Sequence, residues 1–205
     1  MIRAAGLCQE EKSMTFDQSQ TRENLMRAFA GECMARQRYD YAAQAADKEK
    51  LYAVGRLFRF TADQEREHAE LFYTRLSPAP GLVTIRADYP AQPDARALAL
   101  LNAAVENEMS ENASIYPRFA AVADHEGFPD VARLFERVAA IEKTHGDRFA
   151  RYAQWLEGGL LFHSEEETAW VCLNCGHVLT GTDAPLLCPV CRHAQGYFVR
   201  SSGVL

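Results

Sequence analysis

Two short segments place carboxylate and imidazole side chains where a helix would carry apolar ones. "ADQEREHAELF" (62–72) contains Glu65 and His68 three residues apart, and "VAAIEKTHGDRF" (138–149) repeats the spacing with Glu142 and His145. Both pairs fall on the apolar stripe of an amphipathic pattern, whereas their charged neighbours occupy the other faces. An ionised carboxylate in a dry core is costly unless it is paired or bound to a metal. These four residues are therefore candidate metal ligands.

The same arrangement occurs twice along the chain. Glu32 lies 33 residues before Glu65, and Glu108 lies 34 residues before Glu142, so the pattern indicates a duplicated helical hairpin. A single Glu-x-x-His segment is usually a solvated helix face. Two such segments on apolar stripes, each with an upstream glutamate at a matching distance, predict a site for two metals. Glu111 is a further carboxylate on the stripe, outside the repeat.

The chemistry of these side chains agrees with a dimetal site. Five carboxylates that converge in a core repel one another and take up protons, and two divalent cations offset most of that charge. Carboxylate and imidazole ligands suit iron or manganese, and bridging carboxylates hold paired metals about 3.5–4 Å apart. The ligand pattern matches that of ferritin-like di-iron and di-manganese proteins. Tyr39 and Tyr116 also lie on the stripe. They are either core aromatics or hydrogen-bond partners of the ligand carboxylates.

A second candidate site consists of two Cys-x-x-Cys pairs separated by twelve residues. Its members are Cys172, Cys175, Cys188 and Cys191. In a reducing compartment such pairs indicate thiolate metal ligands, and four thiolates suit zinc or a single iron. Iron is favoured because zinc has no redox chemistry, whereas a dimetal site that turns over needs single electrons. A nucleic-acid-binding zinc ribbon is the alternative, but 170–205 carries only three charged residues, a poor footprint for phosphates. A tail or core-filling role is expected for Cys8 and Cys33.

Long helices must position the bundle ligands. Helices are predicted at 21–47, 50–76, 94–127 and 129–159. Thr21 and Asp94 are expected N-caps, and Pro117 should kink the third helix because it removes one backbone hydrogen bond. The 17-residue segment 77–93 is rich in Pro and Gly and is predicted to be a loop. It can span ~55 Å, more than the ~40 Å of each helix. Two hairpins joined by one long crossover predict a ferritin-like four-helix bundle.

The chain is predicted to be mainly α, with a small metal-binding β/loop region after the bundle. The expected parts are a disordered extension (1–16), the bundle (17–159), a linker (160–168) and a four-cysteine domain (169–205), which needs its metal to fold. The net charge of −6 argues against nucleic acid or an anionic membrane as partner. No apolar run approaches ~18 residues and no signal-peptide core is present, so a cytoplasmic location is expected.

The combined motifs resemble those of rubrerythrins. "AGECMARQRY", "ADQEREHAELF", "ENEMSENASIYPRFA" and "IEKTHGDRF", followed by "WVCLNCG" and "LCPVC", carry the resemblance over about residues 21–200. It implies a ferritin-like di-iron domain joined to a rubredoxin-like domain with one Fe(Cys)4 centre, where zinc is also conceivable in isolated protein. The implied activity is NAD(P)H-linked reduction of hydrogen peroxide to water in oxidative-stress defence. The implied partners are a rubredoxin or an NAD(P)H-dependent reductase as electron donor, and a second copy of the chain in a head-to-tail homodimer or higher homo-oligomer.

The resemblance also implies roles for individual residues. Glu65 and Glu142 would bridge the irons, while Glu32 and Glu108 would be terminal ligands together with His68 and His145. Glu111 would exchange with His68 when one iron changes oxidation state, and Tyr39 and Tyr116 match tyrosines beside the ligands. The N-terminal extension and Cys33, next to Glu32, depart from the family pattern. The alternative functions are a ferroxidase or iron-handling role, and a non-catalytic redox sensor or electron carrier.

Overall fold

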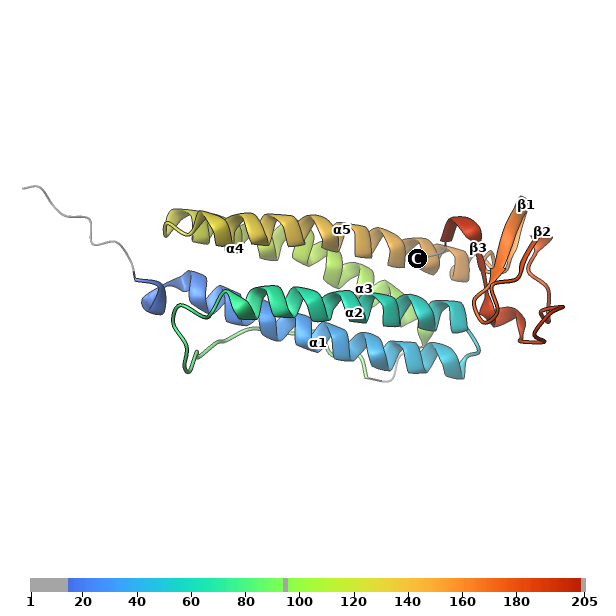
Figure 1. Cartoon of the computed structure of the whole chain (residues 1–205), viewed down its shortest axis with the longest axis horizontal. Coiled ribbons are helices and arrows are strands. Elements are labelled where there is room, and N and C mark those ends of the chain that lie inside the picture. Colours follow the sequence, from blue (N-terminus) through green and yellow to red (C-terminus); the bar gives the residue numbers. More distant parts are fainter. Residues whose placement is uncertain (1–14, 94–95, 204–205) are drawn as a thin grey trace, which may run out of the picture.

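The computed structural model describes residues 15–93 and 96–203. Figure 1 shows a long bundle of helices with a small region of strands seated at one end. The predicted N-terminal extension falls almost entirely outside the described residues, as do Cys8 and the expected cap Asp94. Among the described residues, no helix combines the length and apolar character needed to cross a membrane.

The first hairpin consists of α1 (Gln20–Lys48) and α2 (Tyr52–Thr74). The N-cap of α1 is Ser19, whose hydroxyl accepts a 3.1 Å hydrogen bond from the Arg22 backbone N–H, so the prediction of Thr21 was wrong. Thr21 lies two residues further along, within the first turn, and its backbone N–H and hydroxyl donate to Glu126, the residue directly after the helix Tyr116–His125. Between the two helices Lys50 adopts φ 62°, a left-handed conformation that ends α1 and delays the start of α2.

The second hairpin pairs a composite rod with a straight helix. The rod runs through α3 (Ala97–Ser110), the π-helix η2 (Glu111–Ile115) and α4 (Tyr116–His125), and α5 (Pro129–Glu157) returns beside it. The irregularity predicted at Pro117 therefore lies in the turn before it. Proline has no N–H to donate to the preceding turn, and the Tyr116 N–H bonds the Glu111 carbonyl five residues back.

The crossover between the hairpins follows the length of α1, as a ferritin-like connection requires (Figure 1). Arg22 and Arg27 donate to the carbonyls of Ala79 (3.1 Å) and Arg86 (3.2 Å), and the Tyr89 hydroxyl donates to the Arg27 carbonyl (2.9 Å). These contacts fix an irregular loop on the bundle surface and confirm the predicted two-hairpin arrangement.

The core of the bundle has two apolar halves. One is centred on Leu57, Phe58 and Phe149, and the other on Phe72 and Phe135. The candidate ligands on α2 and α5 lie between these halves in sequence, and therefore between them along the helices. Cys33 is exposed on α1, so the core-filling role expected for it was wrong.

The C-terminal region is a three-stranded antiparallel sheet with two long loops. Its strands are β1 (His163–Cys172), β2 (Val178–Asp183) and β3 (Phe198–Arg200), in the order β2-β1-β3. Trp170 pairs with Leu179 on one side and with Arg200 on the other, and its indole is fully buried. Strand β1 begins inside the segment 160–168 that was expected to be a linker. The limits of the predicted domains stay a prediction.

This region packs directly against the end of the bundle. The rings of Tyr52 and Tyr197 stack with centroids 4.2 Å apart, and the Arg200 guanidinium lies 4.5 Å from the Trp155 ring centroid. Gly196 approaches the α1–α2 turn so closely that a Cβ there would lie 1.9 Å from the Lys50 carbonyl oxygen. The contact thus depends on a position without a side chain.

Candidate metal centres

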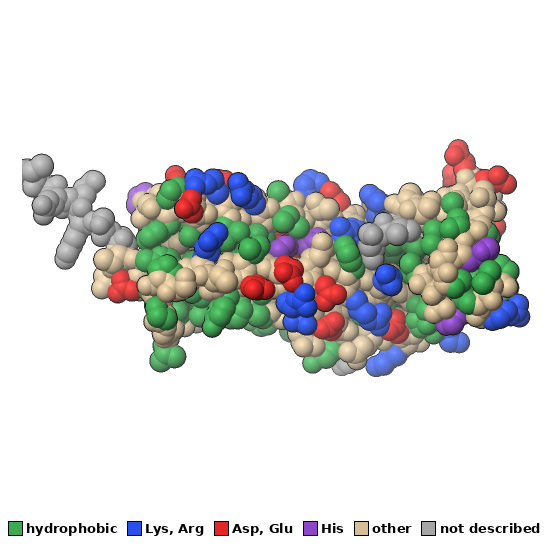
Figure 2. Space-filling view, viewed as in Figure 1, with side chains coloured by type: hydrophobic (Ala, Val, Ile, Leu, Met, Phe, Trp, Pro, Cys, Tyr) green, Lys and Arg blue, Asp and Glu red, His purple; other side chains and the backbone are tan. Residues whose placement is uncertain are grey.

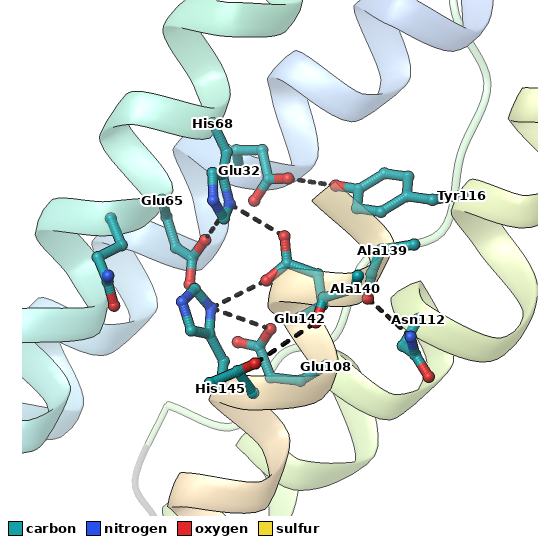
Figure 3. Close-up of polar contacts among 12 residues, drawn as sticks. Glu32, Glu65, His68, Glu108, Asn112, Tyr116, Ala139, Ala140, Glu142 and His145 are labelled. Carbon is teal, nitrogen blue, oxygen red and sulfur yellow. Dashed lines mark hydrogen bonds and ion pairs between the residues drawn. The ribbon is translucent and has the colours of Figure 1, made fainter. Parts of the chain in front are cut away.

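The bundle brings the seven predicted ligand side chains together from every rod. They are Glu32 (α1), Glu65 and His68 (α2), Glu108 (α3), Glu111 (η2), and Glu142 and His145 (α5). All seven are buried, with at most 8% of any residue exposed. Figure 3 shows the labelled glutamates and both imidazoles pointing toward a common space between the helices. The helical phase inferred from the sequence therefore places every predicted ligand on the inside.

Two groups of four residues have ligand atoms within 4.8 Å of one another. One group is Glu32, Glu65, His68 and Glu142; the other is Glu65, Glu108, Glu142 and His145. Glu65 and Glu142 belong to both groups, whereas Glu111 belongs to neither. The arrangement is that of two adjoining cation sites with two shared carboxylates.

The shared carboxylates present one oxygen to each histidine. His68 Nδ1 lies 3.0 Å from Glu65 Oε2 and 2.9 Å from Glu142 Oε1. His145 Nδ1 lies 3.1 Å from Glu65 Oε1 and 2.9 Å from Glu142 Oε2. The two imidazole rings stack with an interplanar angle of 17° and centroids 5.6 Å apart. Each carboxylate therefore spans the two sites in the manner of a bridging ligand.

The donor set fits a pair of metal ions. Both oxygens of Glu65 and of Glu142, and Nδ1 of each histidine, are buried without an aligned hydrogen bond, although they face one another at ion-pair distance. Buried polar groups normally have hydrogen-bond partners, so a set of unpartnered oxygens and nitrogens that face one space indicates a binding site for cations. Carboxylate oxygens and imidazole nitrogens are ligands that suit iron or manganese.

The pKa values of the clustered side chains are strongly shifted by burial and by the neighbouring charges. Burial first, and then the neighbouring carboxylates, raise the pKa values of Glu32 and Glu108 well above their usual range. Burial also acts against ionisation of Glu142, but the two histidines at ion-pair distance outweigh it and lower its pKa to about 2. Burial acts to lower the pKa of His68, but the two shared glutamates at ion-pair distance raise it to about 9. Metal binding would displace protons from these groups.

Two tyrosines hold the unshared carboxylates from neighbouring rods. The Tyr39 hydroxyl donates to Glu108, and the Tyr116 hydroxyl donates to Glu32. Both rings are also buried in the aromatic packing of the core. Each tyrosine is therefore both a core aromatic and a hydrogen-bond partner of a candidate ligand, the two roles that the sequence left open. Each hydroxyl fixes the orientation of a carboxylate that belongs to only one of the two sites.

The π-helix determines which residues of the third rod face the centre. In an α-helix, residues five apart point about 140° away from each other, whereas the five-residue hydrogen bond of η2 brings Glu111 and Tyr116 to the same side. Asn112 stabilises this turn through a 2.7 Å hydrogen bond to the Ala139 carbonyl of α5. The sequence prediction missed the π-helix. The available signal was the spacing of five between two stripe residues, followed directly by Pro117.

Two further residues surround Glu111 that the sequence prediction did not include. Burial, and then the charges of Glu142 and Glu65, raise the pKa of Glu111 to about 8. The Arg38 charge and the adjacent Asn107 amide act in the opposite direction and lower this pKa. Asn107 lies one turn before Glu111, so helical spacing could have identified it.

The cysteine site is formed by two equivalent turns. The Sγ atoms of Cys172 and Cys191 are 3.7 Å apart, as are those of Cys175 and Cys188. Four thiolates at about 2.3 Å from a tetrahedral metal lie about 3.8 Å from one another, so the spacing fits one ion. The four sulfur atoms all lie within 4.8 Å of one another. Within each turn the first Cys carbonyl accepts a hydrogen bond from the residue after the second Cys: Gly176 (2.8 Å) or Arg192 (3.0 Å), both with positive φ.

The two parts of the chain match two family models. Residues 23–153 match the model described as Rubrerythrin, and residues 170–199 match the one described as Rubrerythrin, rubredoxin-like domain. The chain belongs to the rubrerythrin family. The predicted family and fold class are confirmed. Family membership and the two donor sets support two irons in the bundle and one iron at the cysteines.

Curated rubrerythrins are similar over nearly their whole length. The protein of Clostridium perfringens is 43% identical over 88% of this chain and 93% of its own. The rubrerythrin of Nitratidesulfovibrio vulgaris is 41% identical with the same shares covered. A solved structure of nigerythrin in a mixed-valence state has a TM-score of 0.60 and 26% identity, covering 93% of this chain and 90% of that one. These relatives are consistent with an iron-dependent redox role for this rubrerythrin.

Proposed function

We propose that this rubrerythrin is a non-haem di-iron peroxidase that reduces hydrogen peroxide to water. The observation that carries the proposal is the pair of sites sharing Glu65 and Glu142, in one chain with a four-cysteine centre. Reduction of peroxide consumes two electrons and two protons and yields two water molecules. Two ferrous irons side by side would supply one electron each.

The side chains around the site have distinct proposed roles. Glu65 and Glu142 would be shared by the two irons, while Glu32 with His68 would complete one ligand set and Glu108 with His145 the other. Tyr39 and Tyr116 keep the terminal carboxylates oriented, which limits the rearrangement needed when the metals change charge. Glu111 lies in the buried cluster outside both sets, and we propose that it exchanges with His68 as the oxidation state changes.

We propose that a small oxidant approaches the site between α2 and α5. His68 is 4% exposed, and Figure 2 shows histidine atoms at the surface between α2 and α5, among charged side chains of both signs. The apolar core on either side keeps bulk water from the reduced centre.

The four-cysteine iron is the proposed inlet for electrons, supplied by a rubredoxin or an NAD(P)H-dependent reductase. The C-terminal region packs beside Tyr52, and Glu65 lies thirteen residues further along α2, about 20 Å at 1.5 Å per residue. We therefore propose delivery from the cysteine iron of a second copy in a head-to-tail dimer. The cytoplasmic location stays a prediction.

Stopped-flow spectroscopy tests the activity. Anaerobically reduced protein should be reoxidised faster by hydrogen peroxide than by dioxygen. Comparable or slower reaction with peroxide would contradict the proposal and favour ferroxidase chemistry. Steady turnover of peroxide with NAD(P)H and a reductase separates an enzyme from an electron carrier, and Cys172→Ser should abolish that turnover while a single reoxidation of chemically reduced protein persists.

A further inference from the structure

A cavity of about 450 Å³ lies beside the metal cluster, between α1 and α3 and under the end of the crossover loop. Its walls are mostly apolar and include Tyr41, Ala42 and Ala45 of α1, Phe58 of α2, and Leu100 and Ala103 of α3. Cavities of about 300–1,000 Å³ with such walls are typical binding sites for small organic molecules. Hydrogen peroxide has no apolar group that could bind to these apolar walls.

One end of the cavity is polar and borders the metal ligands. Arg38, Tyr39 and Asn107 line it. The Asn107 amide nitrogen is buried there without a hydrogen-bond partner, and both Asn107 and the Arg38 charge act to lower the pKa of the Glu111 carboxyl. The Tyr39 hydroxyl donates to Glu108. Asn107 precedes Glu111 by four residues, about 6 Å along the helix. The polar end of the cavity is therefore one helical turn from a carboxyl of the cluster, and its apolar part extends away from it.

We propose that this cavity binds the organic group of an alkyl hydroperoxide, with the O–O–H end directed to Arg38, Asn107 and the bundle irons. The inference rests on the proposed peroxidase function and extends its substrate class. An apolar group gains about 25 cal/mol for each Å² removed from water, which hydrogen peroxide cannot gain. Guanidinium and amide N–H groups supply donors for the two peroxide oxygens.

The reaction balances in the same way as that of hydrogen peroxide. The O–O bond of R–O–O–H breaks, two electrons from the reduced bundle centre and two protons are consumed, and R–OH and one water molecule are formed. The oxygen bound to carbon leaves with the alcohol, and the terminal oxygen becomes water. No reductant is needed beyond the one that serves the proposed peroxidase cycle.

Binding can be measured without turnover. Isothermal titration calorimetry of oxidised, iron-loaded protein with 2-phenyl-2-propanol, the alcohol formed from cumene hydroperoxide, should show saturable binding. Ala103→Phe places a ring in the cavity and should weaken binding at least tenfold. Ala121→Phe, at an exposed alanine of α4 in the same rod, should leave binding unchanged. Absence of binding to the wild-type protein, or equal binding by Ala103→Phe, overturns the proposal.

Stopped-flow reoxidation then compares the two oxidants. In the wild-type protein cumene hydroperoxide should reoxidise the reduced centre, and Ala103→Phe should lower the ratio of its rate constant to that of hydrogen peroxide at least tenfold. Ala45→Phe, at a half-buried position on the opposite wall, decides the point if Ala103→Phe does not fold. Reaction with hydrogen peroxide but not cumene hydroperoxide overturns the inference alone. Reaction with neither refutes the proposed function as well.

Discussion

The two shared carboxylates lead to an asymmetric prediction for metal content. Glu65 contributes an oxygen to both four-residue groups, whereas Glu32 contributes to one. Loss of even an outer partner of a metal ligand costs on the order of 10–100-fold in affinity, and loss of a direct ligand is expected to cost at least as much. Glu65→Gln should therefore weaken both bundle sites, while Glu32→Gln should weaken one. Glutamine preserves side-chain volume, so packing of the core changes little.

Iron content per chain measures the difference. The wild-type protein should hold about three irons, Glu32→Gln about two and Glu65→Gln about one, the last being the iron of the cysteine site. The red colour of the oxidised four-cysteine iron serves as an internal standard, because neither substitution touches that site. Glu70→Gln, on the exposed face of α2, is the matched control and should retain all three.

Two results would refute this reasoning. Glu65→Gln that retains as much bundle iron as Glu32→Gln would show that Glu65 is not shared. The second result is wild-type protein, purified without oxygen, that holds zinc at the cysteines and no iron in the bundle. This metal content would contradict the predicted three irons per chain. Circular dichroism of each variant excludes unfolding as the cause of metal loss.

Three further predictions concern stability. The pKa of Glu111 is raised to about 8 in the folded protein. The contribution of its protonated form to the free energy of unfolding is therefore fully present below the ordinary pKa of a glutamate and is lost as the pH rises through 8. Metal-free protein should thus melt lower at pH 8.5 than at pH 5.5, and a flat or rising Tm would contradict this. Tyr39→Phe leaves Glu108 without its donor and should cost about 1–3 kcal/mol in urea unfolding; no loss would show that the bond contributes nothing. Gly196→Ala meets a backbone carbonyl and should cost about 1–3 kcal/mol, whereas Gly181→Ala, with its nearest atom at 3.8 Å, should be tolerated; equal melting points would refute the close contact.

Local periodicity made most of the bundle predictable. A buried glutamate or histidine is costly, so its position on an apolar stripe, as for Glu65 and His145, already identifies the inward face. The spacing of the repeat then pairs the two hairpins, and four cysteines at short spacing mark the second centre. These signals depend on residues a few positions apart along one helix or turn.

Other features depend on contacts between distant segments. The sequence favoured Thr21 as the cap of α1, but Thr21 bonds Glu126, more than a hundred residues away, and Ser19 takes the capping position. The π-helix at Glu111 accommodates the missing N–H of Pro117, and it is stabilised by the hydrogen bond from Asn112 to the Ala139 carbonyl of α5. Neither partner is visible from the local pattern of the chain.

The sequence by itself determined which charged side chains converge inside the bundle, because burying charge is so unfavourable that periodicity alone shows where it must be compensated. Only the tertiary structure decided how they share their oxygens, with Glu65 and Glu142 each facing both histidines, since that depends on the relative position of α2 and α5. The tertiary structure also decided the cavity beside Asn107, because a space between two helices is set by how their surfaces fit and not by either helix alone.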